Sequence, residues 1–103
     1  MSIRINESNF ETEVLKSNVP VILDFYSDSC IPCKAMSAVL GDIEDDCDGK
    51  VKIAKVNVNI DSSLAEKFEV TASPTLLYFI DGKETDRTVG MLSKEEIIKK
   101  AGL

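Results

Sequence analysis

Apolar positions follow two different periods along the chain, and the changes of period predict the order of strands and helices. Three apolar runs are too short for helices and are rich in β-branched, aliphatic or aromatic residues. They predict strands at 21–26, 51–58 and 75–80. From Cys33 to Cys47, apolar residues recur at spacings of three and four, which predicts a helix ending near Gly49. The first strand is apolar on both faces except at Asp24, as is typical of a central strand covered by helices on both sides.

Shorter signals complete the order of elements. Residues 3–5 alternate like a short edge strand, and Asp81-Gly82 predicts a hairpin that leads into an edge strand at 83–89. Three capping boxes, in which Ser and Glu side chains bind free backbone amides, predict helix starts. They lie at 8–11, 63–66 and 93–96. The order β-α-β-α-β-α-β-β-α predicts an α/β fold with one mixed sheet between helices.

Length and composition are those of an ordinary globular domain. The chain has 103 residues, 44% of them hydrophobic and 29% charged, which excludes intrinsic disorder and predicts one domain over 1–103. The longest apolar runs, 19–25 and 76–80, are far shorter than a bilayer span. No basic leader precedes an apolar run at the N-terminus, so we expect no secretory signal and a cytoplasmic protein.

The charge balance excludes further classes of function. Twelve basic and eighteen acidic residues leave a net charge of −6, which disfavours binding to a phosphate backbone. The chain has no histidine, so imidazole bases and His-containing metal sites are excluded. Because the sequence has no glycine-rich phosphate loop or other cofactor motif, we expect no bound cofactor.

Cysteine spacing provides the candidate chemistry. Cys30 and Cys33 form a C-x-x-C pair, and Cys47 stands alone as a predicted apolar position of the helix. A zinc or iron–sulfur site usually needs four ligands, whereas only Cys47 remains, about four helical turns from Cys33. A purely structural bridge is also disfavoured, since closing so short a loop stabilises little. Redox chemistry is the favoured interpretation of this pair next to a βαβ pattern.

The two thiols of the pair are expected to differ. Cys30 lies where a strand passes into a helix, near free amides and the positive end of the helix dipole, so its thiolate should attack first. Cys33 lies one turn deeper and is the natural resolving thiol. Pro32 fits the first helical turn, which does not use its missing amide proton. Ile31 adds an apolar patch beside the sulfurs, and Lys34 adds a cation.

Six segments match a known family in order and spacing. They are Asp24-Phe25-Tyr26, Cys30-Ile31-Pro32-Cys33-Lys34, Ala54-Lys55-Val56-Asn57, Ser73-Pro74-Thr75-Leu76, Asp81-Gly82-Lys83 and Val89-Gly90. Through them the chain resembles the thioredoxin family over nearly its whole length. The resemblance implies a thioredoxin fold, with a mixed five-stranded sheet between four helices, and thiol–disulfide exchange with protein substrates.

The resemblance also implies roles for single residues. Cys30 resembles the family's attacking cysteine and Cys33 its resolving cysteine, so that the two form the redox disulfide. Asp24 resembles a buried acid that moves a proton to and from the second thiol, and Lys55 resembles the basic neighbour of that acid. Burial should raise the pKa of Asp24, and the Lys55 ammonium should oppose that rise.

Substrate-binding residues are implied in the same way. Pro74 resembles a cis-proline that faces the cysteines, although the residues alone would predict the commoner trans bond after Ser73. Gly90 resembles a glycine that flanks the substrate groove. Together with Ile31 and Pro32, these residues form the expected binding site for the substrate chain.

Two departures from the family pattern concern the partners. Ser29 stands where the family usually has Trp, and Ile31 stands where it usually has Gly. The resemblance implies a separate reductase that recharges a monomeric carrier, but these changes put the usual NADPH-dependent reductase in doubt. One alternative is an oxidase or isomerase, whose relatives usually have His where this chain has Pro32. The other alternative is a non-enzymatic binding subunit of a partner protein.

Overall fold

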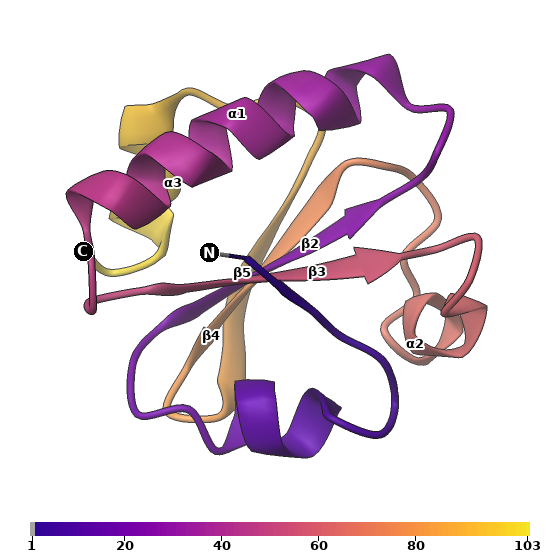
Figure 1. The fold of residues 1–103 in the computed structure, drawn as a ribbon, viewed down its shortest axis with the longest axis horizontal. Helices are drawn as coiled ribbons and strands as arrows, with labels where there is room; N and C mark the ends of the chain where they lie inside the picture. Colours follow the sequence, from indigo (N-terminus) through magenta and orange to yellow (C-terminus); the bar gives the residue numbers. More distant parts are fainter. Residues whose placement is uncertain (1) are drawn as a thin grey trace.

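A five-stranded mixed sheet forms the centre of the computed structural model, which describes residues 2–103. The strands are β1 (Ile3–Arg4), β2 (Val21–Tyr26), β3 (Lys52–Asn57), β4 (Thr75–Ile80) and β5 (Lys83–Val89). Their spatial order is β1-β3-β2-β4-β5. Strands β1 and β2 run parallel to β3, whereas β4 runs antiparallel to β2 and β5 (Figure 1). The predicted mixed sheet with a late hairpin is therefore confirmed.

Helices cover both faces of this sheet. They are η1 (Glu11–Leu15, a short π-helix), α1 (Ile31–Asp46), α2 (Ser62–Lys67) and α3 (Lys94–Lys100). Helices α1 and α3 lie on one face, and η1 and α2 lie on the other (Figure 1). None of the helices within residues 2–103 is long and apolar enough to cross a membrane.

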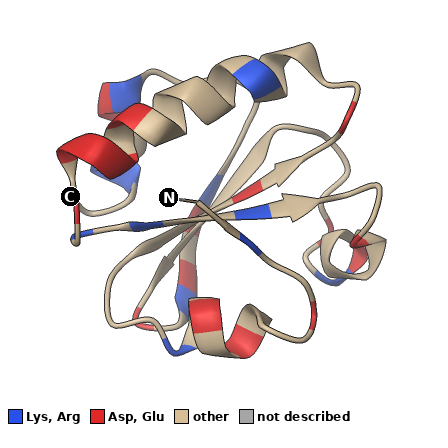
Figure 2. Cartoon of the chain, in the orientation of Figure 1, with Lys and Arg blue, Asp and Glu red and all other residues tan. Residues whose placement is uncertain are grey.

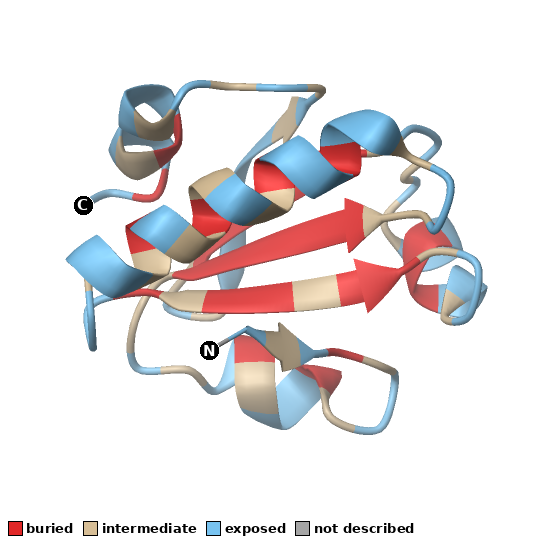
Figure 3. Ribbon diagram, turned by 45° about the horizontal axis from the view of Figure 1, so that its top comes forward, coloured by how far each residue is buried: buried red, intermediate tan, exposed pale blue. Residues whose placement is uncertain are grey.

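Two apolar cores lie on the two faces of the sheet. Leu23 and Phe25 pack with Phe10 of the η1 segment in one core, whereas Ile22 packs with Leu40 of α1 in the other. Alternate residues of a strand point to opposite faces, which explains why β2 contributes to both cores. The strand is accordingly buried along nearly its whole length (Figure 3). The same alternation places Asp24, like Ile22, on the face that α1 covers.

The first predicted capping box is wrong. Phe10 occupies the N-cap position of η1, and no side chain caps that helix. Instead, the Asn6 side-chain carbonyl accepts from the backbone amides of Ser8 and Asn9 and from the Ser8 hydroxyl. An Asn side chain two or three residues before an amide competes well for it, so the turn forms around Asn6 rather than Ser8.

The other helix ends differ in part from prediction. Helix α2 begins at Ser62 with Asp61 at its N-cap and no side-chain cap, so the box at 63–66 is also wrong. In the third box the Ser93 hydroxyl accepts from the Glu96 amide, as predicted. Helix α1 begins at Ile31, two residues earlier than the apolar period indicated, because Cys30 caps it. It ends at Asp46, and Gly49 lies in the following turn with φ of +76°.

The hairpin between β4 and β5 follows from its two turn residues. Asp81 and Gly82 both have positive φ, of 53° and 78°, as a two-residue turn between twisted strands requires. A Cβ atom at Gly82 would lie 2.6 Å from the carbonyl oxygen of Leu15. Only glycine therefore fits where the hairpin passes η1.

Candidate active site

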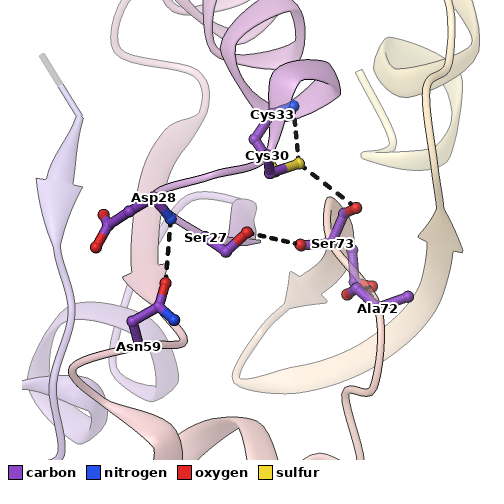
Figure 4. The surroundings of a disulfide bond; sticks show 8 residues. Ser27, Asp28, Cys30, Cys33, Asn59, Ala72 and Ser73 are labelled. Carbon is purple, nitrogen blue, oxygen red and sulfur yellow. Dashed lines mark hydrogen bonds between the residues drawn. A yellow bond between two sulfur atoms is a disulfide. The ribbon is translucent and has the colours of Figure 1, made fainter.

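A disulfide between Cys30 and Cys33 lies at the start of α1, with the two Cα atoms 5.2 Å apart. Cys30 is the N-cap residue and is partly exposed, whereas Cys33 is in the first turn and is 4% exposed. The Cys33 amide donates to Cys30 Sγ at 3.1 Å (Figure 4). Pro32 lies in the first turn, where its missing N–H leaves no bond unmade. The sulfur of Cys30 thus faces an amide donor at a helix start.

A buried acid lies on the neighbouring strand. Asp24 of β2 is 1% exposed, and its Oδ1 atom has no hydrogen-bond partner within the described chain. It pairs in register with Lys55 of β3 (Figure 2). Burial raises the pKa of Asp24 from 3.8 to about 6, although the positive charge of Lys55 lowers it. The Lys55 ammonium itself donates a hydrogen bond to Ser37 Oγ of α1.

One cavity of about 270 Å³ connects these groups. It is lined by Asp24, Tyr26, Ser27, Asp28, Cys30, Cys33, Lys34, Ser37 and Lys55. Both cysteines therefore share this cavity with the acid and with its basic neighbour. A proton can pass between Cys33 and Asp24 within this cavity without crossing the apolar core.

Two loops meet the disulfide from the other side. The peptide bond between Ser73 and Pro74 is cis, and the Ser73 carbonyl oxygen lies 3.6 Å from Cys30 Sγ (Figure 4). The Gly90 amide donates to the Pro74 carbonyl at 2.9 Å, which holds the two loops together. Gly90 has a φ of +87°, a conformation that other residues rarely adopt. The structure therefore brings Ser73, Pro74 and Gly90 to the side of the cysteines.

Apolar side chains are exposed at the start of α1 and on the loops near it. Ile31, directly after Cys30, is 80% exposed. Ile60 and Met91 are also exposed. Ile60 follows Asn59, whose side chain accepts a hydrogen bond from the Asp28 amide at the cavity, and Met91 follows Gly90. An apolar surface beside a reactive sulfur can contact the chain that carries the partner sulfur.

Sequence reasoning missed several residues of this site. Ser37 lines the cavity, and its position four residues after Cys33 on the same helix face is a signal that could have found it. The Ser27 hydroxyl lies 3.2 Å from that of Ser73 (Figure 4), for which no sequence signal exists because the two lie 46 residues apart. Tyr26, at the end of β2, is only half-buried and lines the cavity.

Comparison with known proteins agrees with this geometry. The family model described as Thioredoxin matches residues 1–102. The chain belongs to the thioredoxin family. It is 32% identical over 99 residues to the thioredoxin of Rickettsia bellii, and the aligned part covers 96% of this chain and 94% of the Rickettsia protein. It is 35% identical over 95 residues to the thioredoxin of Pseudomonas aeruginosa (92% and 88%). The thioredoxin of Chlorobaculum thiosulfatiphilum is 38% identical over 94 residues (91% and 87%).

Family membership and the paired cysteines together define the class of activity. A thioredoxin chain with a C-x-x-C pair at disulfide distance is a thiol–disulfide oxidoreductase. The alternative of a binding subunit without redox activity is not favoured, because the pair is present and bonded. Among residues 2–103, no three Cys, His, Asp or Glu side chains are grouped so that they could hold a metal ion.

Proposed function

We propose that the chain reduces protein disulfides, with Cys30 as the attacking thiol and Cys33 as the resolving thiol. The difference in exposure between the two sulfurs carries this assignment. Cys30 is reachable from solvent and receives the Cys33 amide, which favours negative charge on its sulfur. Cys33 is 4% exposed, so it acts only on the mixed disulfide that Cys30 has already formed with the substrate.

The exchange takes two steps, each of which makes one S–S bond and breaks another. The Cys30 thiolate attacks a substrate disulfide, forms a mixed disulfide and releases one substrate thiolate, which takes up a proton. The Cys33 thiolate then attacks Cys30 Sγ and releases the second substrate sulfur as a thiolate. The substrate gains two electrons, and the chain is left with the disulfide between Cys30 and Cys33.

Asp24 is proposed to take the proton from Cys33 in the second step. Its carboxyl group and the Cys33 side chain line the same cavity, and its pKa of about 6 lets the carboxylate form accept a proton near neutral pH. Lys55 is proposed to hold that pKa within a useful range, since its charge opposes the effect of burial. Without a local base, the buried Cys33 thiol would ionise slowly.

The substrate chain is proposed to bind across Ile31, Pro32, Ser73, Pro74 and Gly90. Three observations support this proposal. The Ser73 carbonyl oxygen lies 3.6 Å from Cys30 Sγ, the Gly90 amide is bonded to the Pro74 carbonyl, and Ile31 supplies exposed apolar area directly after Cys30. Ile31→Ser should raise KM for a protein disulfide and leave the rate with a small organic disulfide unchanged. Leu15→Ser, at an exposed apolar position of η1 away from the cysteines, is the control.

The family implies disulfide substrates and a reductase partner in general. We further propose that residues 1–103 act as one thioredoxin domain, as a monomer and in the cytoplasm. A separate reductase would return two electrons to the disulfide. Ser29 and the exposed Ile31 differ from the residues that the family usually has there, and so they change the surface that this reductase must contact. Testing several reductases with the purified chain identifies it.

Alkylation of the reduced chain tests the assignment of the two thiols. The chain is reduced, treated briefly with iodoacetamide at mildly alkaline pH, and digested so that the label can be mapped by mass spectrometry. Cys47→Ser serves as the background, because it removes the third thiol. We expect the label on Cys30 first. Preferential labelling of Cys33 would overturn the assignment.

Asp24→Asn tests the proton transfer separately. The first attack on a substrate disulfide should keep its rate, whereas release of the substrate from the mixed disulfide should slow. Rapid quenching of the reaction separates the two steps. Equal rates for release in the variant and the parent chain across pH 6–9 would contradict the role of Asp24.

A further inference from the structure

Two serine hydroxyls form a bond beside the disulfide that the proposed mechanism does not use. Ser27 Oγ and Ser73 Oγ lie 3.2 Å apart (Figure 4). The Ser27 carbonyl accepts from the Cys30 amide at 3.4 Å, and the Ser73 carbonyl oxygen lies 3.6 Å from Cys30 Sγ. The hydroxyl pair therefore joins the segment that carries Cys30 to the loop that faces it.

The other hydrogen bonds of this loop fix it elsewhere. Thr75 Oγ1 donates to the Ala72 carbonyl at 2.7 Å, which closes the loop on itself. The Gly90 amide donates to the Pro74 carbonyl, which ties the loop to its neighbour. Neither bond reaches the segment that carries Cys30. The pairing of Phe25 with Thr75 places the two strands side by side, and beyond the strands the bond between Ser27 and Ser73 joins that segment to the loop. Both serine side chains are half-buried, where water competes less for such a bond.

The Ser73 carbonyl and the Cys33 amide act on Cys30 in opposite directions. The amide donor at 3.1 Å favours a thiolate. In the reduced chain, the Ser73 carbonyl oxygen can accept a hydrogen bond from a protonated Cys30 thiol, which favours the thiol. Toward a Cys30 thiolate it presents the negative end of its dipole, which disfavours the thiolate. How close this carbonyl lies to the sulfur therefore affects how much reactive thiolate forms.

We propose that Ser27 and Ser73 are positioning residues whose hydroxyl bond holds the Ser73 carbonyl against Cys30 Sγ and so restrains thiolate formation there. This inference rests on the proposed role of Cys30 as the attacking thiol. Without either hydroxyl, the loop can move its carbonyl away from the sulfur. The amide of Cys33 then acts on Cys30 with less opposition, and the thiolate forms at lower pH.

Charged groups near Cys30 are the same in the parent chain and in the serine variants. Asp24 of β2, Asp28 of the connecting loop, Lys34 of α1 and Lys55 of β3 line the cavity that Cys30 shares. Neither Ser27→Ala nor Ser73→Ala removes or adds a charge. A change in the pH at which Cys30 becomes reactive therefore reports on the position of a dipole rather than on a lost charge.

The test measures the rate of Cys30 alkylation against pH in the reduced chain, in the Cys47→Ser background. Ser27→Ala and Ser73→Ala should each lower the pH midpoint by about 0.5, which corresponds to roughly threefold more thiolate below the midpoint. The double variant should show no further shift, because both changes break the same bond. Ser73→Thr keeps the hydroxyl and should retain the parent midpoint. Ser63→Ala, exposed on α2, is the control for a remote serine.

Each outcome decides between the proposals. Unchanged midpoints in both single variants, or shifts that add in the double variant, would overturn the positioning role of the serines. A midpoint that Ser73→Thr also lowers would overturn it too, since the hydroxyl would then not be the cause. Should Ser27→Ala fail to fold, the pair Ser73→Ala and Ser73→Thr still gives the answer. A label that maps to Cys33 in the parent chain would instead contradict the assignment of the attacking thiol.

Discussion

Replacing the buried acid with its neutral amide should stabilise the chain at neutral pH and much less at acidic pH. Asp24 is 1% exposed, and its Oδ1 atom has no hydrogen-bond partner within residues 2–103. Burial raises its pKa from 3.8 to about 6, against the opposing charge of Lys55. The folded chain therefore holds this proton at pH values where the unfolded chain has already released it.

The sign and the size of the effect follow from these two pKa values. Between pH 4 and pH 6 the folded state binds more protons than the unfolded state, so the free energy of unfolding falls as pH rises. Above pH 7 both states are ionised, and the folded state has lost about 3 kcal/mol relative to low pH. Asp24→Asn cannot ionise and escapes this loss. Its advantage over the parent chain should grow by roughly 2.5 kcal/mol from pH 4 to pH 8.

Urea unfolding of the oxidised chain at a series of pH values measures this difference. The buried amide has a desolvation cost of its own, but that cost is the same at each pH and cancels in the comparison. Asp45→Asn, an exposed acid near the C-terminal end of α1, is the matched control and should show no such growth. A stability difference between Asp24→Asn and the parent chain that stays constant from pH 4 to pH 8 would refute the reasoning.

Three further predictions concern the thiols, the basic neighbour and the core. Cys33→Ser keeps the attacking thiol but loses the resolving thiol, so it should accumulate a mixed disulfide with a protein substrate, which a non-reducing gel detects. Cys30→Ser should form no mixed disulfide. Lys55→Met removes the charge that lowers the pKa of Asp24, so the pH profile of turnover should move to higher pH. Leu40→Ala, at a fully buried position of α1, should reduce the free energy of unfolding by ~2–5 kcal/mol in urea.

Each of these three predictions would be contradicted by a specific result. A Cys33→Ser variant that turns over like the parent chain would exclude a resolving role for Cys33. A pH profile that stays in place in Lys55→Met would show that this charge does not act on the acid. A loss of less than ~1 kcal/mol in Leu40→Ala would mean that the core closes around the missing side chain.

The fold could be predicted because most of its signals are local. Strand β2 is apolar at every position but one, and the period of α1 changes clearly from that of the strands around it. The turn at Asp81-Gly82 needs two left-handed residues, and this dipeptide supplies them. The capping box at 8–11 failed because the Asn6 side chain binds the Ser8 amide that the box would use. The box at 63–66 failed because α2 begins at Ser62, with no side-chain cap.

The site could be predicted only as far as its residues are neighbours in sequence or members of the family pattern. Cys30 and Cys33 stand three residues apart, so their pairing follows from helix geometry. The bond between Ser27 and Ser73 and the bond between Lys55 and Ser37 join segments that are distant in sequence. Such contacts depend on the register of β2, β3 and β4 and on the placement of α1, which periodicity does not give.

Stability and chemistry oppose each other at Asp24. At neutral pH the ionised carboxylate costs the folded state about 3 kcal/mol, a large part of the ~5–15 kcal/mol that usually separates folded from unfolded domains. The same burial that causes this loss brings the pKa of the acid to about 6, where its carboxylate can take a proton near neutral pH. A solvated aspartate would destabilise nothing, but its lower pKa would make it a weaker base for the Cys33 thiol. Lys55 limits the loss without removing the basicity, because it acts on Asp24 by charge while its ammonium is bonded to Ser37.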